Sequence, residues 1–81
     1  MAPADRLTLA QPDGQYLIRV YDHDQPAATA AVRRDRQMPG HLHISKIPPA
    51  VLQARAALLD QWITAKGDGE YHITTTIRKV A

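Results

Sequence analysis

The chain has 81 residues, no cysteine, a formal net charge of +2 and a pI of about 9.3. This length suits one small domain, and the missing cysteines exclude a disulfide framework, a thiolate zinc site and a cysteine nucleophile. No stretch provides the roughly 20 apolar residues that span a bilayer, and residues 1–6 lack the apolar core of a signal peptide. We therefore expect a cytoplasmic protein without a membrane partner. Its richness in arginine and alanine is typical of a GC-rich bacterial gene.

The first part of the chain alternates between apolar and polar residues, as strands do. We expect a flexible lead-in over residues 1–6, then a single α+β domain over residues 7–81 that opens with a strand at 7–10. Pro12-Asp13-Gly14 predicts a turn. Residues 15–22 predict a second strand. Its two faces carry different side chains: Tyr16, Ile18 and Val20 on one, and Leu17, Arg19 and Tyr21 on the other.

Two further strands are predicted before the helix. Residues 27–34 alternate but are rich in alanine, whose β signal is weak, so a helix is the main alternative there. We favour a strand because the segment is short and flanked by turns. Residues 41–47 alternate more clearly, with Leu42 and Ile44 directed inward and His41 and His43 outward.

Residues 48–66 give the clearest helix signal, between the prolines at 48 and 49 and Gly67. Residues 70–80 predict a last strand, so the order is β-β-β-β-α-β: a mostly antiparallel sheet with one helix on one face. One apolar stripe of the helix should pack on the sheet: Leu52, Leu58, Leu59, Trp62 and Ile63. The facing strand residues should be Ile18, Val20, Leu42, Ile44, Ile73 and Ile77.

A single helix covers one sheet face and leaves the other open to water or to a partner. That open face should carry Arg19, Tyr21, Arg33, His41, His43, Thr74, Thr76 and Arg78. Apolar Leu17, Ala31 and Val80 on the same side, together with exposed edge strands, favour self-association as a homodimer.

The densest charge cluster is Arg33-Arg34-Asp35-Arg36. Arginine binds phosphate and carboxylate with two parallel hydrogen bonds, so we expect this cluster, at the end of the predicted strand and in the loop after it, to form a contact surface. With Arg19 and Arg78 it could form a basic stripe on which Tyr21 stacks a base. The partner-binding candidates are Arg19, Tyr21, Arg33, Arg34, Arg36, His41, His43 and Arg78.

Catalytic and metal chemistry find less support. His41 and His43 share a predicted strand face, and the candidates for a third metal ligand are His72, His23 and Asp24, but two half-exposed polar histidines explain the pattern better. Ser45 lies near His43 without a placed acid, and no glycine-rich phosphate loop occurs, so we expect no catalytic residue, no cofactor and no metal. The favoured function is a non-catalytic binding module for a protein partner or a second copy. Single-stranded nucleic-acid binding is the alternative, and a small metal-dependent or hydrolytic enzyme is third.

Overall fold

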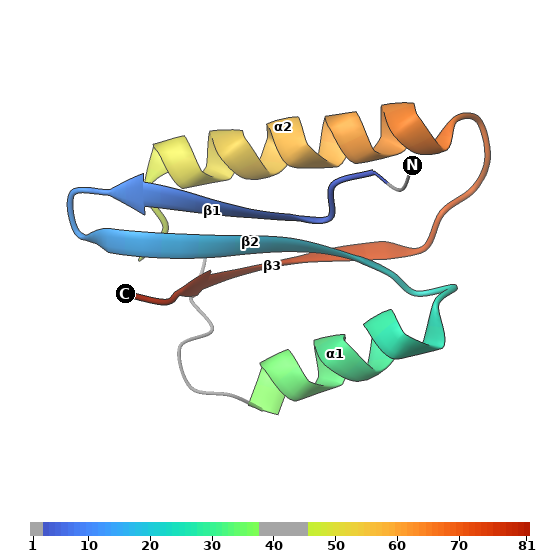
Figure 1. The fold of residues 1–81 in the computed structure, drawn as a ribbon, viewed down its shortest axis with the longest axis horizontal. Helices are drawn as coiled ribbons and strands as arrows, with labels where there is room; N and C mark the ends of the chain where they lie inside the picture. The colour runs from blue at the N-terminus through green and yellow to red at the C-terminus, as the bar shows by residue number, and fades with distance from the viewer. Residues whose placement is uncertain (1–2, 38–45) are drawn as a thin grey trace.

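A computed structural model describes residues 3–37 and 46–81 of the protein (Figure 1). The described elements are β1 (Arg6–Gln11), β2 (Gly14–Asp22), α1 (Pro26–Gln37), α2 (Pro49–Lys66) and β3 (Ile73–Lys79). The fold class is α+β, as predicted, but the described part holds a three-stranded sheet and two helices rather than the five strands and one helix of the predicted order β-β-β-β-α-β.

The sheet is antiparallel, with β2 between β1 and β3. The turn predicted at residues 12–14 is confirmed, since β1 ends at Gln11 and β2 begins at Gly14. Ile18 lies opposite Leu7 and Ile77, and the next residue, Arg19, lies opposite Arg6 and Thr76. Because directly opposite residues share a face, this register sorts the sheet into the two predicted faces.

The first face packs under α2 and forms the main core. The predicted helix is confirmed to within one residue, and it buries Val51, Leu58 and Trp62 at helical spacing. Trp62, with 3% of its surface exposed, meets Tyr71 edge to face at 5.4 Å between ring centroids. Ile63 was expected in this core, but it is 43% exposed because it is rotated about 100° from Trp62. The core cluster consists of Tyr16, Ile18, Val20, Val51, Leu58, Trp62 and Ile77.

The segment at 27–34 is helical, so its prediction as a strand was wrong. It lies within α1, which starts at Pro26 and runs for 12 residues. The physical reason is the alanine content, since alanine is the best helix former and its small side chain defines no sheet face. Proline is also well suited to the first helical turn, where its missing N–H is not needed. Figure 1 shows α1 and α2 on opposite sides of the sheet.

As a result, the second sheet face is partly covered, which corrects the expectation of an open face. Tyr21 and Val32 are each 3% exposed and Thr76 is 8% exposed. Thr74 contacts the ring nitrogen of His23 through its hydroxyl, which ties the end of β2 to β3.

The predicted strand at 41–47, with its inward Leu42 and Ile44, falls mainly outside the described residues. The two residues of it that are described, Lys46 and Ile47, are not in a strand. Neither α1 nor α2 combines the length and the apolar character that crossing a membrane would require.

Candidate binding site

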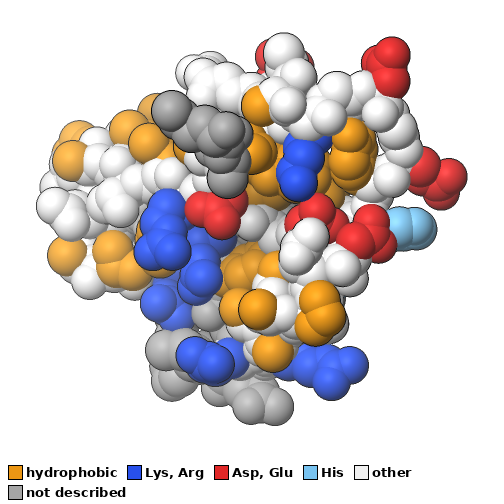
Figure 2. All heavy atoms as spheres, turned by 45° about the vertical axis from the view of Figure 1, so that its right-hand side comes forward, with side chains coloured by type: hydrophobic (Ala, Val, Ile, Leu, Met, Phe, Trp, Pro, Cys, Tyr) orange, Lys and Arg blue, Asp and Glu red, His pale blue; other side chains and the backbone are white. Residues whose placement is uncertain are grey.

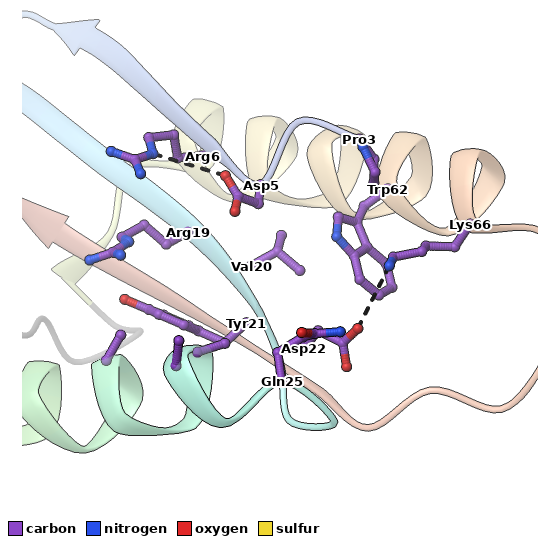
Figure 3. A pocket seen from close by; sticks show the side chains of 13 residues that line it. Pro3, Asp5, Arg6, Arg19, Val20, Tyr21, Asp22, Gln25, Trp62 and Lys66 are labelled. Atoms are coloured by element: carbon purple, nitrogen blue, oxygen red, sulfur yellow. Dashed lines mark ion pairs between the residues drawn. The ribbon is translucent and has the colours of Figure 1, made fainter. Parts of the chain in front are cut away.

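A cleft of about 510 Å³ opens at the edge of the sheet where β1 begins (Figure 3). Just before β1, the Asp5 carbonyl oxygen accepts a hydrogen bond from the Val20 N–H of β2, at 2.8 Å. Before Asp5 the chain rises toward α2, so the end of β2 extends past the paired part of β1 (Figure 3). The lining comes from every described element except β3: Pro3, Asp5, Arg6, Arg19, Val20, Tyr21, Asp22, Gln25, Ala27, Ala28, Ala31, Trp62 and Lys66.

Two arginines form the basic side of this cleft. Arg6 and Arg19 lie directly opposite each other on β1 and β2, and Figure 3 shows both guanidinium groups extending in the same direction. Arg6 pairs with Asp5, whose carboxylate oxygen lies 3.9 Å from the Arg6 Nε, and both side chains are more than half exposed. An exposed ion pair at this distance is weak. The strand register thus brings two guanidinium groups together where two neighbouring strands meet.

Tyr21 lies beneath Arg19 and positions it. The Arg19 guanidinium carbon is 4.9 Å from the centre of the Tyr21 ring, a cation–π contact. Because Tyr21 is only 3% exposed, its ring offers little surface on which a base could stack. Its contribution to the cleft is to hold Arg19 in place from below.

The opposite end of the cleft is closed by an ion pair. The Lys66 Nζ lies 3.8 Å from a carboxylate oxygen of Asp22, and this link joins the end of α2 to the end of β2 (Figure 3). The same ammonium lies 5.3 Å from the Trp62 ring centre. The other Asp22 oxygen accepts a hydrogen bond from the Asp24 N–H at 3.0 Å. Asp22 therefore has two structural partners, the Lys66 ammonium and the Asp24 N–H.

On the α1 side, the wall of the cleft consists of small side chains, which leave the space open. Ala27, Ala28 and Ala31 line the cleft. Arg34 follows Ala31 by three residues and therefore lies on the same side of the helix. Both Arg33 and Arg34 are exposed.

The predicted partner-binding residues thus fall into separate groups. Arg19 and Tyr21 line the cleft, and Arg78 lies on β3 opposite Leu17, on the same sheet face as Arg19. Arg36 belongs to the last turn of α1, whereas His41 and His43 lie outside the described residues. Figure 2 shows Lys and Arg side chains gathered around the middle of this side of the molecule, with others below them.

Sequence reasoning missed Arg6, which had been placed in the lead-in. The hairpin register carries this information. Gln11 pairs with Gly14 across a two-residue turn, so counting away from the turn, backward along β1 and forward along β2, brings Arg6 opposite Arg19. Lys66 and Asp22 were seen only as a helix end and a strand end, because their meeting depends on where α2 packs.

Within residues 3–37 and 46–81, no three His, Cys, Asp or Glu side chains come close enough together to hold a metal ion. Comparison with known proteins found no matching family model, no matching curated protein and no matching solved structure.

Proposed function

We propose that this protein is a non-catalytic binding module for an acidic protein partner. The contact surface, here named the arginine surface, consists of Arg6, Arg19, Arg34 and Arg78. The observation that carries the proposal is the placement of Arg6 directly opposite Arg19 at a cleft. Guanidinium groups bind carboxylates through paired, charge-assisted hydrogen bonds, so two of them on adjacent strands favour an anionic partner.

An acidic protein suits this surface better than a nucleic acid. The cleft also carries Asp5 and Asp22, whose negative charges would repel a continuous run of phosphates. Single-strand binding proteins usually stack bases on exposed aromatic rings, whereas Tyr21 and Trp62 are each only 3% exposed. A protein segment can instead place single carboxylates where the arginines lie and small apolar groups where the alanines lie.

The chemistry of the lining favours binding over catalysis. Among the described lining residues there is no serine, cysteine or histidine, the side chains that most often act as nucleophiles or as general acids and bases. The two carboxylates present lie beside cations, Asp5 near Arg6 and Asp22 near Lys66. Such pairs suit the recognition of charge.

Fluorescence anisotropy with labelled peptides and oligonucleotides tests this function. We expect a hexaglutamate peptide to bind at low salt and a hexaglutamine peptide not to bind. Arg78→Gln should weaken the glutamate complex by up to about fivefold, the range for one exposed ion pair. No binding of hexaglutamate at about 100 μM would overturn the proposal. Tighter binding of a 12-nucleotide oligo-dT, with a salt slope of about −0.7 per phosphate, would assign the surface to nucleic acid instead.

A further inference from the structure

We infer that the cleft between α1 and α2 is a pocket for one carboxylate side chain of the partner, held by Arg6 and Arg19, with a small apolar side chain beside it against the alanines of α1. This inference rests on the proposed function and makes it specific. It assigns recognition to one cavity, whereas the proposed function requires only the wider arginine surface.

The size and shape of the cleft suit a short peptide segment. Its volume of about 510 Å³ lies within the range of roughly 300–1,000 Å³ that is usual for ligand sites. The two helices approach it from opposite faces of the sheet, and the paired part of β1 stops at its edge (Figures 1 and 3). A segment of chain can therefore lie between the helices with side chains directed at β2.

The charges are divided along the cleft in a way that orients such a segment. Arg6 and Arg19 mark one end, and the Lys66–Asp22 pair closes the other. A carboxylate is attracted to the two guanidinium groups at the first end, where Arg6 is paired only weakly with the exposed Asp5. At the second end, the positive charge of Lys66 is already paired with the negative charge of Asp22. The basic end is thus the preferred position for the acidic side chain.

The α1 wall decides what lies next to that carboxylate. Ala27, Ala28 and Ala31 expose only methyl groups, and longer side chains at these positions would fill the cavity. Figure 3 shows the side chains of the α1 wall beside Tyr21, on the far side of the cleft from Trp62. An acidic residue followed by a small apolar residue fits both walls, so we use a peptide of three Glu-Ala repeats as the probe.

The matched pair Ala27→Glu and Ala50→Glu tests the pocket. Each alanine is exposed and follows the proline that opens its helix, and both changes remove one unit of net positive charge, but only Ala27 lines the cleft. We expect Ala27→Glu to weaken binding of the labelled Glu-Ala peptide about tenfold, because a carboxylate inside the cleft repels the carboxylates of the peptide and takes up their space. Ala50→Glu should change it less than about twofold, since Ala50 lies at the end of α2 away from Lys66 and the cleft, where its charge is screened.

Ala27→Glu should weaken binding without lowering the stability of the fold. A glutamate in the first turn of α1 interacts favourably with the helix dipole, so Ala27→Glu should unfold no more easily than the unaltered protein. A circular dichroism melt checks this. A second pair, Arg6→Gln and Arg33→Gln, removes one exposed arginine inside and one outside the cleft. Arg6→Gln should again weaken binding about tenfold, and Arg33→Gln less than about twofold.

Chemical-shift mapping gives a reading without substitutions. Adding the Glu-Ala peptide should shift the backbone amides of Tyr21, Ala28 and Ala31 more than those of α2 residues away from the cleft. Equal losses within each matched pair, or shifts confined to residues outside the cleft, would overturn the pocket while leaving the acidic-partner function intact. Failure of every acidic peptide to bind the unaltered protein would instead remove the proposed function itself.

Discussion

The two faces of the sheet are covered by helices of very different composition. Seven buried side chains form one cluster between α2 and the sheet, and Trp62, Leu58 and Val51 of this cluster come from α2. On the α1 side the buried residues of the described part are Tyr21, Val32 and Thr76, and much of the helix wall is alanine. In the described part of the chain, the same three strands therefore support one thick apolar layer and one thin layer.

This difference separates the side of the sheet that supplies most of the stability from the side to which we assign recognition. Hydrophobic stabilisation grows with the apolar area removed from water, about 25 cal/mol per Å², so the large side chains of α2 supply most of it. Alanines bury little area, and they leave room for the cleft and for Arg19 on Tyr21. A helix rich in leucine at the position of α1 would stabilise the fold and would occupy the space in which we place the partner.

The strongest test of the comparison is Trp62→Ala. Because Trp62 is 3% exposed and belongs to the core cluster under α2, its removal should lower the free energy of unfolding by about 3–5 kcal/mol. Ile63→Ala is the control on the same helix, and at 43% exposure it should cost less than about 1 kcal/mol. Urea titration followed by far-UV circular dichroism measures both. Similar losses for the two variants would mean that α2 lies differently on the sheet.

The corresponding test of the thin face is Val32→Ala. Val32 is as buried as Trp62, but the change removes only two methyl groups, so we expect the free energy of unfolding to fall by about 1.6 kcal/mol. Native-state hydrogen exchange should show the α1 amides opening before the α2 amides, since fewer apolar contacts hold α1. A loss for Val32→Ala as large as that for Trp62→Ala would remove the distinction between the faces.

The sequence was sufficient wherever side chains define a face. Alternation predicted β2 and its two faces, because Ile18 and Val20 differ sharply from Arg19. The helical stripe predicted α2 because it contains Leu58 and Trp62. In α1 the pattern consists of alanines, which satisfy both a period of 2 and a period of 3.6, so alternation there carried no information. The higher helix propensity of alanine was the better guide.

The site was less accessible to sequence reasoning, because it depends on packing. The alternating pattern of β2 predicted Arg19 as a site residue. Arg6 could have been predicted only from the register of the hairpin, which places it opposite Arg19. That Tyr21 is buried, and that Lys66 meets Asp22, results from how α1 and α2 lie across the sheet. Those long-range placements leave no local pattern in the chain.

A smaller effect, confined to alkaline solution, concerns the α2 face. The Tyr16 hydroxyl donates a 2.5 Å hydrogen bond to Asp13, and this bond, with burial and the negative charge of Asp13 as lesser causes, raises the pKa of Tyr16. The folded state thus holds the proton more tightly than the unfolded chain, whose tyrosine pKa is about 10. This contribution is complete below pH 10 and is lost as the pH rises through the higher folded value.

Asp13→Asn should therefore lower the Tyr16 pKa, measured from the tyrosine ring signals in an alkaline NMR titration. It should also flatten the fall of stability above pH 10. Asp24→Asn, at the other end of β2, is the control and should leave the Tyr16 titration unchanged, because Asp24 has no part in that hydrogen bond. A Tyr16 titration unaffected by Asp13→Asn would show that the hydrogen bond does not form in solution.

The smallest effect we expect belongs to the one described ion pair that joins the α2 layer to the end of β2. The Lys66 and Asp22 side chains are 33% and 14% exposed and 3.8 Å apart, so solvent screens them partly. A double-mutant cycle with Lys66→Met and Asp22→Asn should give a coupling energy of about 0.5–1 kcal/mol, shrinking in 1 M salt. Methionine keeps an apolar stem over Trp62, and asparagine keeps an oxygen for the Asp24 N–H, so the cycle isolates the charge interaction. A coupling near zero at low salt would mean that the charges of Lys66 and Asp22 do not hold the end of α2 to the end of β2.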